Sequence, residues 1–286
     1  MNEEKTKQKI AFQGSYGANS DLACRQFYAD FTTIACTDFD EVFHLVENGE
    51  VDYGMIPLEN SYAGRVSEIH NLLQNSKTVI VAEHFFKVRH NLVGVLGTKL
   101  ADIKQIYSHP QALMQCKNNL ANFKFEQIEY SNTAQAAKFI AQKNDKSKAA
   151  LCSSLAAQIN DLELIKEDLQ DDKENNFTIF ITIAKNGIDP ALENKDRKII
   201  TTMLFTVRNI PGALNKALGG FATNNVNMLK LESYIPGGIS KQAKFFISIE
   251  GHPSQRNVGL ALEEMGFFSK SVKVLGVYYA DEMRFK

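Results

Sequence analysis

Four clusters of hydrogen-bonding side chains lie at the ends of short apolar segments that are typical of β-strands. They are rich in amides, hydroxyls and glycines rather than in charges, and they lie at residues 14–20, 59–61, 108–111 and 176–178. In open α/β sheets, ligands bind at the carboxyl ends of the strands, and clefts between lobes are preferred sites. Uncharged donors and helix N-termini together suit an anionic small molecule. We therefore expect these clusters to line a site for such a ligand.

Each cluster also has an ordinary structural interpretation. The glycine turn at residues 14–20 binds an anion in some α/β units and nothing in others. Asn60 and Ser61 could cap the next helix or stabilise a turn. His109 could begin a helix or contact a ligand, and Arg65 could clamp a carboxylate or be a surface charge.

No residue pair in the sequence indicates nucleophilic catalysis. Ser108 and His109 are adjacent, and neighbours in one turn rarely reach the geometry of a triad. Cys116 and Cys152 lie on apolar faces and are expected in the core. The cysteines form no CxxC pair and have no metal-ligand spacing with histidine. The acids within residues 161–174 are expected on a solvated face rather than around a metal ion, since helical spacing would scatter them.

The composition predicts a folded protein with no general attraction to polyanions. The chain has 286 residues, of which 44% are hydrophobic, and its 32 basic and 33 acidic side chains give a net charge of -1. Such a balance supplies no broad attraction to nucleic acid or to an anionic membrane. The charged N-terminus has no apolar signal core, and no apolar run approaches the roughly 18 residues of a membrane span. We expect a cytoplasmic protein with reduced thiols.

Alternating strand and helix patterns place the four clusters on an α/β framework. We predict strands at residues 9–14, 51–58, 78–86, 92–96, 103–107, 124–130, 149–152 and 177–184. We predict helices at residues 21–28, 39–48, 66–73, 108–120 and 133–142. This order favours mainly parallel sheets with helices on both faces, in two lobes, and the last strand returns the chain to the first lobe.

The pattern changes after residue 198 and predicts a second, smaller domain. A polar stretch with Gly187 and Pro190 precedes it, as expected of a linker. Strands at 199–207, 228–234, 244–250 and 272–279, a turn at 236–238 and helices at 211–223 and 257–265 give the order βαββαβ of a ferredoxin-like fold. Pro211 and Gly212 leave backbone N–H groups that could receive a carboxylate, although an ordinary helix start explains them equally well.

Several motifs, taken together, resemble the prephenate dehydratase family with a C-terminal ACT regulatory domain. Those of the first region are IAFQGSYGANS at 10–20, DYGMIPLENS at 52–61, SHPQALMQC at 108–116 and NTAQAA at 132–137. They occur in family order. The ACT module is indicated by GALNKAL at 212–218 and LESYIP at 231–236. The segments AGRVSEIH at 63–70 and LGGFATN at 218–224 are similar to the alphaproteobacterial branch.

The resemblance implies an α/β fold with two lobes around a cleft, like type 2 periplasmic binding proteins, followed by an α+β ferredoxin-like ACT domain. It implies a catalytic domain at 8–185, a linker at 186–198 and an ACT domain at 199–281. The family converts prephenate to phenylpyruvate, water and carbon dioxide in phenylalanine biosynthesis, without a metal or an organic cofactor. Phenylalanine inhibits the family enzymes, which are homodimers or homotetramers.

The resemblance also assigns roles to residues. The implied catalytic residues are Thr178, Asn60, Ser108 and Gln115. Thr178 would meet the departing hydroxyl, and because an unperturbed threonine is a poor acid, we expect it to donate a hydrogen bond rather than a proton. Further substrate contacts are expected from Ser61, His109, Gln111, Thr133 and Phe180. Phenylalanine is expected between the ACT modules of two subunits, at Asn209, Gly212, Ala213, Leu214, Asn227, Met228, Leu229, Glu232 and Ser233.

The sequence departs from the family pattern at one position that bears on the substrate. The family usually has Thr-Arg-Phe where this chain has Thr178-Ile179-Phe180. Losing a charge-assisted contact to a substrate carboxylate would cost about 1.5–3 kcal/mol, unless another cation such as Arg65 replaces it. Further departures are Ser131 before Asn132, Leu229 in place of a common threonine, and Tyr234-Ile235 within the Glu-Ser-Arg-Pro motif.

Three functions remain open at this level. The first is a prephenate dehydratase under feedback control by phenylalanine. The second is a dehydratase that prefers arogenate, in which the missing arginine reflects an altered substrate charge. The third is a catalytically weak regulator that binds an amino acid without turnover.

Overall fold

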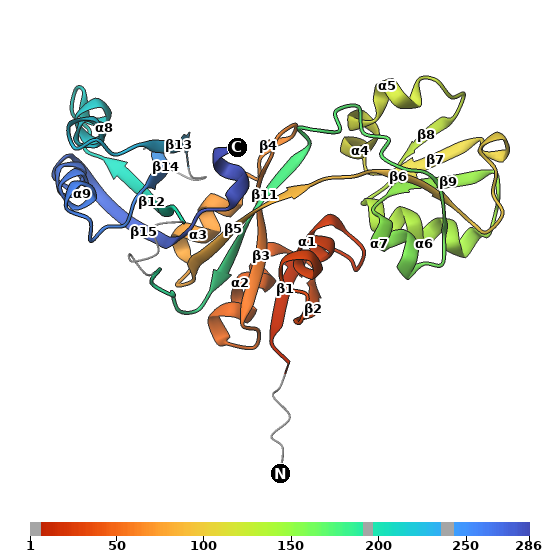
Figure 1. The fold of residues 1–286 in the computed structure, drawn as a ribbon, viewed down its shortest axis with the longest axis horizontal. Coiled ribbons are helices and arrows are strands. Elements are labelled where there is room, and N and C mark those ends of the chain that lie inside the picture. The colour runs from red at the N-terminus through yellow and green to blue at the C-terminus, as the bar shows by residue number, and fades with distance from the viewer. Residues whose placement is uncertain (1–6, 191–196, 236–242) are drawn as a thin grey trace, which may run out of the picture. The chain divides into compact units, whose positions relative to one another are not determined.

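The computed structural model describes residues 7–190, 197–235 and 243–286, and these form three β-sheets with flanking helices (Figure 1). They divide into two compact units. The first comprises the chain up to Leu45 together with Val51–Val66 and Phe85–Phe180. The second comprises Val46–Glu50, Ser67–His84 and the chain from Ile181 onward. The domain boundaries at 185 and 199 stay predictions, and the predicted turn at 236–238 and part of the predicted linker lie outside the described residues.

The first sheet has the strand order β2-β1-β3-β11-β5, with the short β4 paired to β3. Its strands are β1 (Lys9–Gln13), β2 (Thr32–Cys36), β3 (Tyr53–Asn60), β4 (Gly64–Arg65), β5 (Val79–Lys87) and β11 (Phe177–Ala184). The helices along this part of the chain are α1 (Asn19–Phe27), α2 (Phe39–Asn48) and α3 (Ile69–Asn75). Alternate residues of β1, Ile10 and Phe12, pack with Ala23 and Cys24 of α1. β11 joins this sheet, as the sequence predicts.

The second sheet, order β10-β6-β9-β7-β8, forms the other lobe of the first unit. Its elements are β6 (Asn91–Gly94), η1 (Leu100–Asp102), β7 (Gln105–Ser108), α4 (Pro110–Gln115), α5 (Lys117–Leu120), β8 (Glu126–Glu129), α6 (Thr133–Lys143), β9 (Lys148–Cys152), α7 (Ser154–Ile159) and β10 (Glu163–Lys166). Because side chains alternate along a strand, Ala149 and Leu151 of β9 pack with α4 and α5, whereas Ala150 and Cys152 pack with α6 and α7 on the opposite face (Figure 1).

Two expectations for this lobe are corrected by the structure. The sheet is mixed rather than mainly parallel, because β7 pairs parallel with β8 and β9, while β6 pairs antiparallel with β9 and β10. The acid-rich segment 161–174 is not a helix and contains β10. Its Asp171 carboxylate accepts hydrogen bonds from the backbone N–H groups of Asn118 and Asn119, both at 2.9 Å. The acid there stabilises the start of α5.

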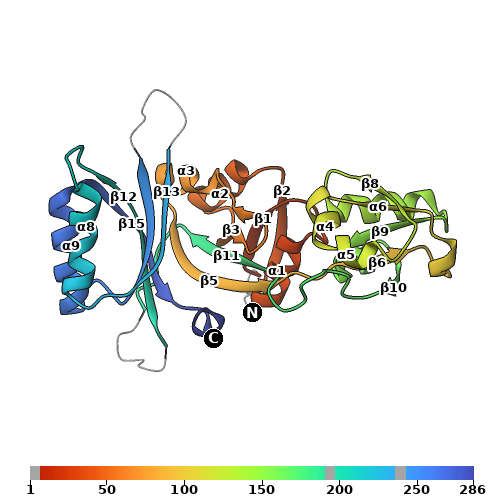
Figure 2. The ribbon, with the colours of Figure 1, turned by 90° about the horizontal axis from the view of Figure 1, so that it is seen from above.

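The C-terminal sheet confirms the ferredoxin-like order. Its elements are β12 (Ile199–Val207), α8 (Ala213–Thr223), β13 (Met228–Tyr234), β14 (Lys244–Glu250), α9 (Arg256–Phe268) and β15 (Ser269–Tyr279), with the short η2 (Glu282–Phe285) at the end. The strands are antiparallel in the order β13-β14-β12-β15. Both helices cover one face of the sheet (Figure 2), where Met203, Phe221 and Ile247 share a core.

The opposite face of this sheet contacts α3 within the second unit. The ammonium group of Lys273 on β15 donates to the carbonyl oxygens of Leu73, Gln74 and Ser76 at 2.8, 2.9 and 2.6 Å. These carbonyls lie at the C-terminal end of α3, where a cation complements the helix dipole. No helix among the described residues is long and apolar enough to cross a membrane.

Candidate active site

A cavity of about 340 Å³ opens within the first unit, and residues from both of its lobes line it. The first lobe supplies the ends of β1 and β3 with the starts of β11 and α1, and the second lobe supplies the starts of α4 and α6. Seven residues predicted from the sequence line it together, namely Asn60, His109, Gln111, Gln115, Thr133, Thr178 and Phe180.

Asn60 fixes the hydroxyl group of Thr178 in one orientation. The Asn60 Oδ1 accepts the backbone N–H groups of Tyr62 and Ala63, both at 3.0 Å, which identifies this atom as the carbonyl oxygen. The Nδ2 group therefore points the other way and donates to Thr178 Oγ1 at 3.1 Å. Because Thr178 accepts this bond, its own hydrogen is available to a second acceptor.

Gln115 extends this arrangement into the second lobe. Its Nε2 donates to Asn60 Oδ1 at 3.3 Å, and its Oε1 lies 2.8 Å from His90 Nε2 and 3.0 Å from Asn176 Nδ2. Since this oxygen can only accept, His90 carries its proton on Nε2. Burial lowers the pKa of His90, so the ring is neutral at pH 7. Asn60, Gln115 and His90 thus form an uncharged network rather than an acid–base pair.

Two helices of the second lobe begin at the cavity. His109 Nδ1 accepts the backbone N–H of Gln111 at 3.3 Å and caps α4, while the ring also lines the cavity. Both interpretations of His109 therefore apply. Asn132 Oδ1 accepts the backbone N–H of Gln135 at 2.8 Å and caps α6, which Thr133 opens. Helix N-termini favour negative charge, so this wall of the cavity suits an anion.

Two predicted site residues are not among those that line the cavity. Ser108 is fully buried, and its hydroxyl donates to the carbonyl of Leu151 at 2.6 Å. Ser61 donates to the carbonyl of Asn175 at 2.6 Å and accepts the N–H of Phe177 at 3.1 Å. Ser61 thereby ties the turn after β3 to the start of β11. Ser61 therefore supports the strands that carry Asn60 and Thr178, whereas Ser108 ties β7 to β9 in the second lobe.

The glycine turn after β1 connects the two lobes. The carbonyl of Gly17 accepts a hydrogen bond from Ser153 Oγ at 2.6 Å, and Ser15 Oγ accepts one from Gln135 Nε2 at 2.8 Å. Gly17 has φ of +87°, a backbone conformation that favours glycine. Asn19 and Ser20, which follow the turn, line the cavity.

Sequence reasoning missed one buried partner and left another residue open. His90 precedes β6 and has no spacing relationship to the motifs, so only its contact with Gln115 identifies it. Arg65 lies on β4, and the structure places it in the cavity wall. Ile179, where the family usually has arginine, is not among the lining residues, as the alternation around Thr178 and Phe180 would require.

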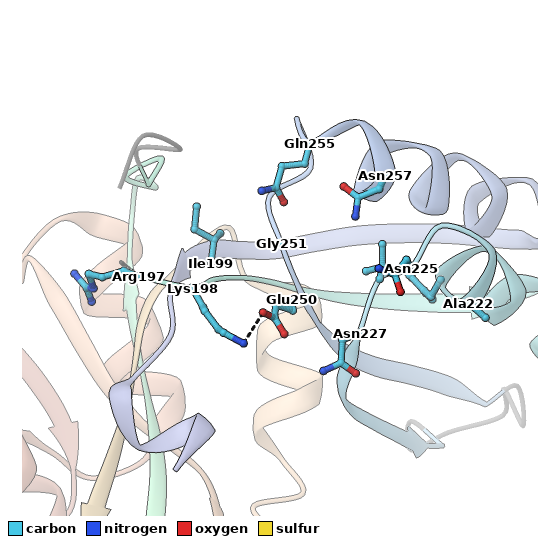
Figure 3. Close-up of a pocket in the computed structure, with 12 residues that line it drawn as sticks. Arg197, Lys198, Ile199, Ala222, Asn225, Asn227, Glu250, Gly251, Gln255 and Asn257 are labelled. Carbon is cyan, nitrogen blue, oxygen red and sulfur yellow. Dashed lines mark ion pairs between the residues drawn. The ribbon is translucent and has the colours of Figure 1, made fainter. Parts of the chain in front are cut away.

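A second hollow, of about 810 Å³, is lined by residues of the C-terminal sheet, its helices and their connections (Figure 3). Its described lining is rich in carboxamides, including Asn225, Gln255 and Asn257, and it holds an ion pair of 2.8 Å between Lys198 and Glu250. Of the residues expected to bind phenylalanine, Asn227 alone is among those that line it.

The residues expected to bind phenylalanine fall into two groups within one chain. In the first group, Ser233 of β13 pairs with Phe245 of β14, which in turn pairs with Phe205 near the end of β12. Glu232 and Ser233 therefore lie level with the segment after β12, which holds Asn209 to Leu214. Met228 instead pairs with Ile249, opposite Thr201 at the start of β12. At about 3.3 Å per residue, the group around Met228 lies more than 10 Å along the sheet. One chain does not bring the two groups together.

Glu232 contacts one residue of α3 and one residue of its own strand, β13. Its two carboxylate oxygens lie 3.1 Å from the Nε2 of the fully buried His70 and 3.1 Å from the Nζ of Lys230. The contact with His70, and then the charge of Lys230, lower the pKa of Glu232 to about 2. The carboxylate is therefore ionised across the physiological range, and it connects the C-terminal sheet to α3.

Comparison with known proteins identifies the family. A family model described as prephenate dehydratase matches residues 10–188, which contain the whole cavity lining. The chain belongs to the prephenate dehydratase family. The predicted resemblance is thus confirmed for the region that carries the site.

The similarity to curated and solved members extends over nearly the whole chain. A bifunctional N-acyl-homoserine lactone acylase/prephenate dehydratase of Komagataeibacter europaeus is 40% identical over 97% of this chain and 98% of its own length. Arogenate dehydratase 2 of Petunia hybrida is 33% identical over 98% of this chain and 74% of its own length. The structure of prephenate dehydratase in complex with L-Phe from Arthrobacter aurescens is 28% identical, with a TM-score of 0.86 over 96% of this chain and 91% of that one.

Proposed function

We propose that this chain converts prephenate to phenylpyruvate, water and carbon dioxide in the cavity of its first unit, as a carbon–oxygen lyase of phenylalanine biosynthesis. The observation that carries the proposal is the hydrogen bond from Asn60 to Thr178, which leaves the threonine hydrogen for an acceptor in the cavity.

The four free cysteines are all buried, which supports a reducing compartment such as the cytoplasm.

The chemistry needs orientation and hydrogen bonding more than a covalent intermediate. Prephenate loses its ring carboxylate as carbon dioxide, and the electron pair of that bond expels the ring hydroxyl as the ring becomes aromatic. Thr178 donates a hydrogen bond to the departing oxygen, on which negative charge develops, and a solvent proton completes the water. Asn60 and Gln115 orient the threonine through the contacts described above. The capped helix starts at His109 and Asn132 face the anionic substrate.

Arogenate is the second candidate substrate, because a relative named arogenate dehydratase is 33% identical over almost the whole chain. Arogenate and prephenate share the ring and its two leaving groups, so the network around Thr178 suits both. The two differ in the side chain, which bears a keto group in prephenate and an ammonium group in arogenate.

The decisive test offers three substrates to the purified chain. We expect the chain to form phenylpyruvate from prephenate. We expect the kcat/KM for prephenate to exceed the kcat/KM for arogenate, from which the product is phenylalanine. An N-acyl-homoserine lactone, to which the name of the Komagataeibacter relative refers, tests for an additional hydrolysis. In the described cavity lining, Thr178 is hydrogen-bonded to an amide rather than to a general base, so we expect no acyl transfer from it. Failure to form phenylpyruvate at high enzyme concentration would overturn the proposal.

We further propose that phenylalanine binds the C-terminal domain and inhibits the reaction. The related Arthrobacter structure, which is a complex with L-Phe, supports this assignment. The predicted effector residues lie in two groups at opposite ends of the sheet, so a homodimer or homotetramer in which a second copy completes the site would unite them. Inhibition requires that phenylalanine bind a less active state more tightly. Thermal stability and rate, measured with and without phenylalanine, test this part.

A further inference from the structure

Arg65 supplies the fixed positive charge of the cavity. Among the described residues that line it, Arg65 is the one arginine, and no lysine is present. Of the two histidines that line the cavity, His90 is kept neutral by burial, and His109 uses its Nδ1 atom to accept the backbone N–H of Gln111. A dianionic substrate therefore meets one guanidinium within a wall of amides, hydroxyls and helix starts.

The position of Arg65 is tied to the reacting group. β4 pairs antiparallel with β3 so that Arg65 lies opposite Glu59 and Gly64 lies opposite Asn60. Asn60 also holds the tip of this hairpin through the N–H groups of Tyr62 and Ala63. One residue thus fixes both the Thr178 hydroxyl and the strand from which Arg65 extends. Glu59 also lines the cavity, and its negative charge balances the positive charge of Arg65. Arg65 therefore acts on a ligand through direct contact rather than through a long-range field.

We propose, on the basis of the function proposed above, that Arg65 holds the side-chain carboxylate of prephenate and selects prephenate over arogenate. The ring carboxylate loses its charge as carbon dioxide departs, so a cation on it would stabilise the ground state more than the transition state and slow the reaction. The side-chain carboxylate keeps its charge throughout. A guanidinium on that group contributes binding that is uniform along the reaction, which lowers KM without lowering kcat.

The same contact discriminates between the two substrates. In prephenate the carbon next to the side-chain carboxylate is a neutral ketone. In arogenate that carbon bears an ammonium group, which the guanidinium repels at short distance. Arg65 therefore favours prephenate, and its removal reduces the preference.

The test measures kcat and KM for both substrates with wild-type enzyme and with Arg65→Gln, Arg65→Lys and Arg256→Gln. Arg256 is an exposed arginine at the start of α9, outside the cavity lining, and serves as the matched control. We expect Arg65→Gln to raise the KM for prephenate about 10- to 100-fold, with kcat within about threefold of wild type and a smaller ratio of the two kcat/KM values. Arg65→Lys keeps the charge but not the bidentate geometry, so its KM should lie between those of wild type and Arg65→Gln.

Distinct results overturn distinct proposals. If the wild-type enzyme forms no phenylpyruvate, the proposed function and this inference are both overturned. An active wild type whose Arg65→Gln variant keeps both its KM and its substrate preference overturns the inference alone. A fall in kcat at unchanged KM would place Arg65 on the reacting group and would also overturn it.

Discussion

At the scale of single residues, carboxamides rather than charges organise the site. Asn60 and Gln115 each use both ends of the amide group, so that each has one possible orientation. Their contacts leave the Thr178 hydroxyl as a donor toward the cavity. An uncharged donor can meet developing negative charge without having to titrate.

Thr178→Val tests this assignment, because valine keeps the branched shape and removes the hydroxyl. We expect kcat to fall about 100- to 1000-fold, as for the loss of one preorganised donor. Thr178→Ser retains the hydroxyl and should stay within about tenfold of wild type. Steady-state kinetics with prephenate make the comparison, and a Thr178→Val variant as active as Thr178→Ser would contradict the role of the hydroxyl.

At the scale of elements, the turn that contains Gly17 connects the two lobes of the first unit. A Cβ atom at residue 17 would lie 2.8 Å from the Cα of Ala156 on α7, and φ is +87°. Moving a flexible side chain would relieve neither the close contact nor the positive φ, because the contact is with the backbone of Ala156.

Gly17→Ala should therefore destabilise the chain, by about 1–3 kcal/mol for the backbone conformation and about 1–3 kcal/mol for the clash. Gly64→Ala is the matched control, since Gly64 also has a positive φ, of +74°, and a Cβ atom at that residue would have no neighbour within 4 Å. Urea unfolding of both variants separates the two effects. Equal destabilisation would mean that the contact with Ala156 contributes nothing.

The contact between β13 and α3 predicts a pH-dependent contribution from Glu232. Its pKa in the folded state, about 2, is below the value of 4.5 for a free glutamate. The unfolded chain thus takes up the proton first, so this stabilisation is present above pH 4.5 and is lost as the pH falls toward 2. The difference in melting temperature between wild type and Glu232→Gln should be largest near pH 7 and shrink between pH 5 and pH 2. A constant difference would contradict the ion-pair explanation.

At the scale of the whole molecule, both compact units contain a histidine held neutral by burial. His90 lies in the first unit, and His84 lies in the second. Burial lowers the pKa of both rings, to about 4 for His84. The unfolded chain binds protons on these rings below about pH 6.5, whereas the folded chain does not. Acidification from pH 6.5 toward pH 4 therefore favours unfolding.

We accordingly expect the midpoint of urea unfolding to fall between pH 7 and pH 5. His84→Gln removes one of the two rings, and its midpoint should fall less over the same interval. Unfolding curves of wild type and variant at several pH values provide the measurement. The same pH dependence in both proteins would mean that His84 takes up its proton without unfolding.

The sequence by itself determined most of the elements and the family. The predicted bounds of α2, β12, β13 and β14 match the structure, because each carries a regular pattern of apolar residues whose period follows from local geometry. The strands β2, β4 and β10 and the helix α7 were not predicted. β10 is short and largely exposed, so it lacks the alternation that burial imposes.

Only the tertiary structure decided which side chains meet. Ser108 and Gln115 belong to one motif, yet Ser108 is buried against β9 whereas Gln115 reaches Asn60, His90 and Asn176 from distant parts of the chain. Arg65 and Ile179 are a second example. Strand pairing brings Arg65 into the cavity wall, whereas the alternation of side chains along β11 keeps Ile179 out of it. A local pattern fixes the face on which a residue lies, but contacts between remote segments depend on how the strands pair and how the lobes pack.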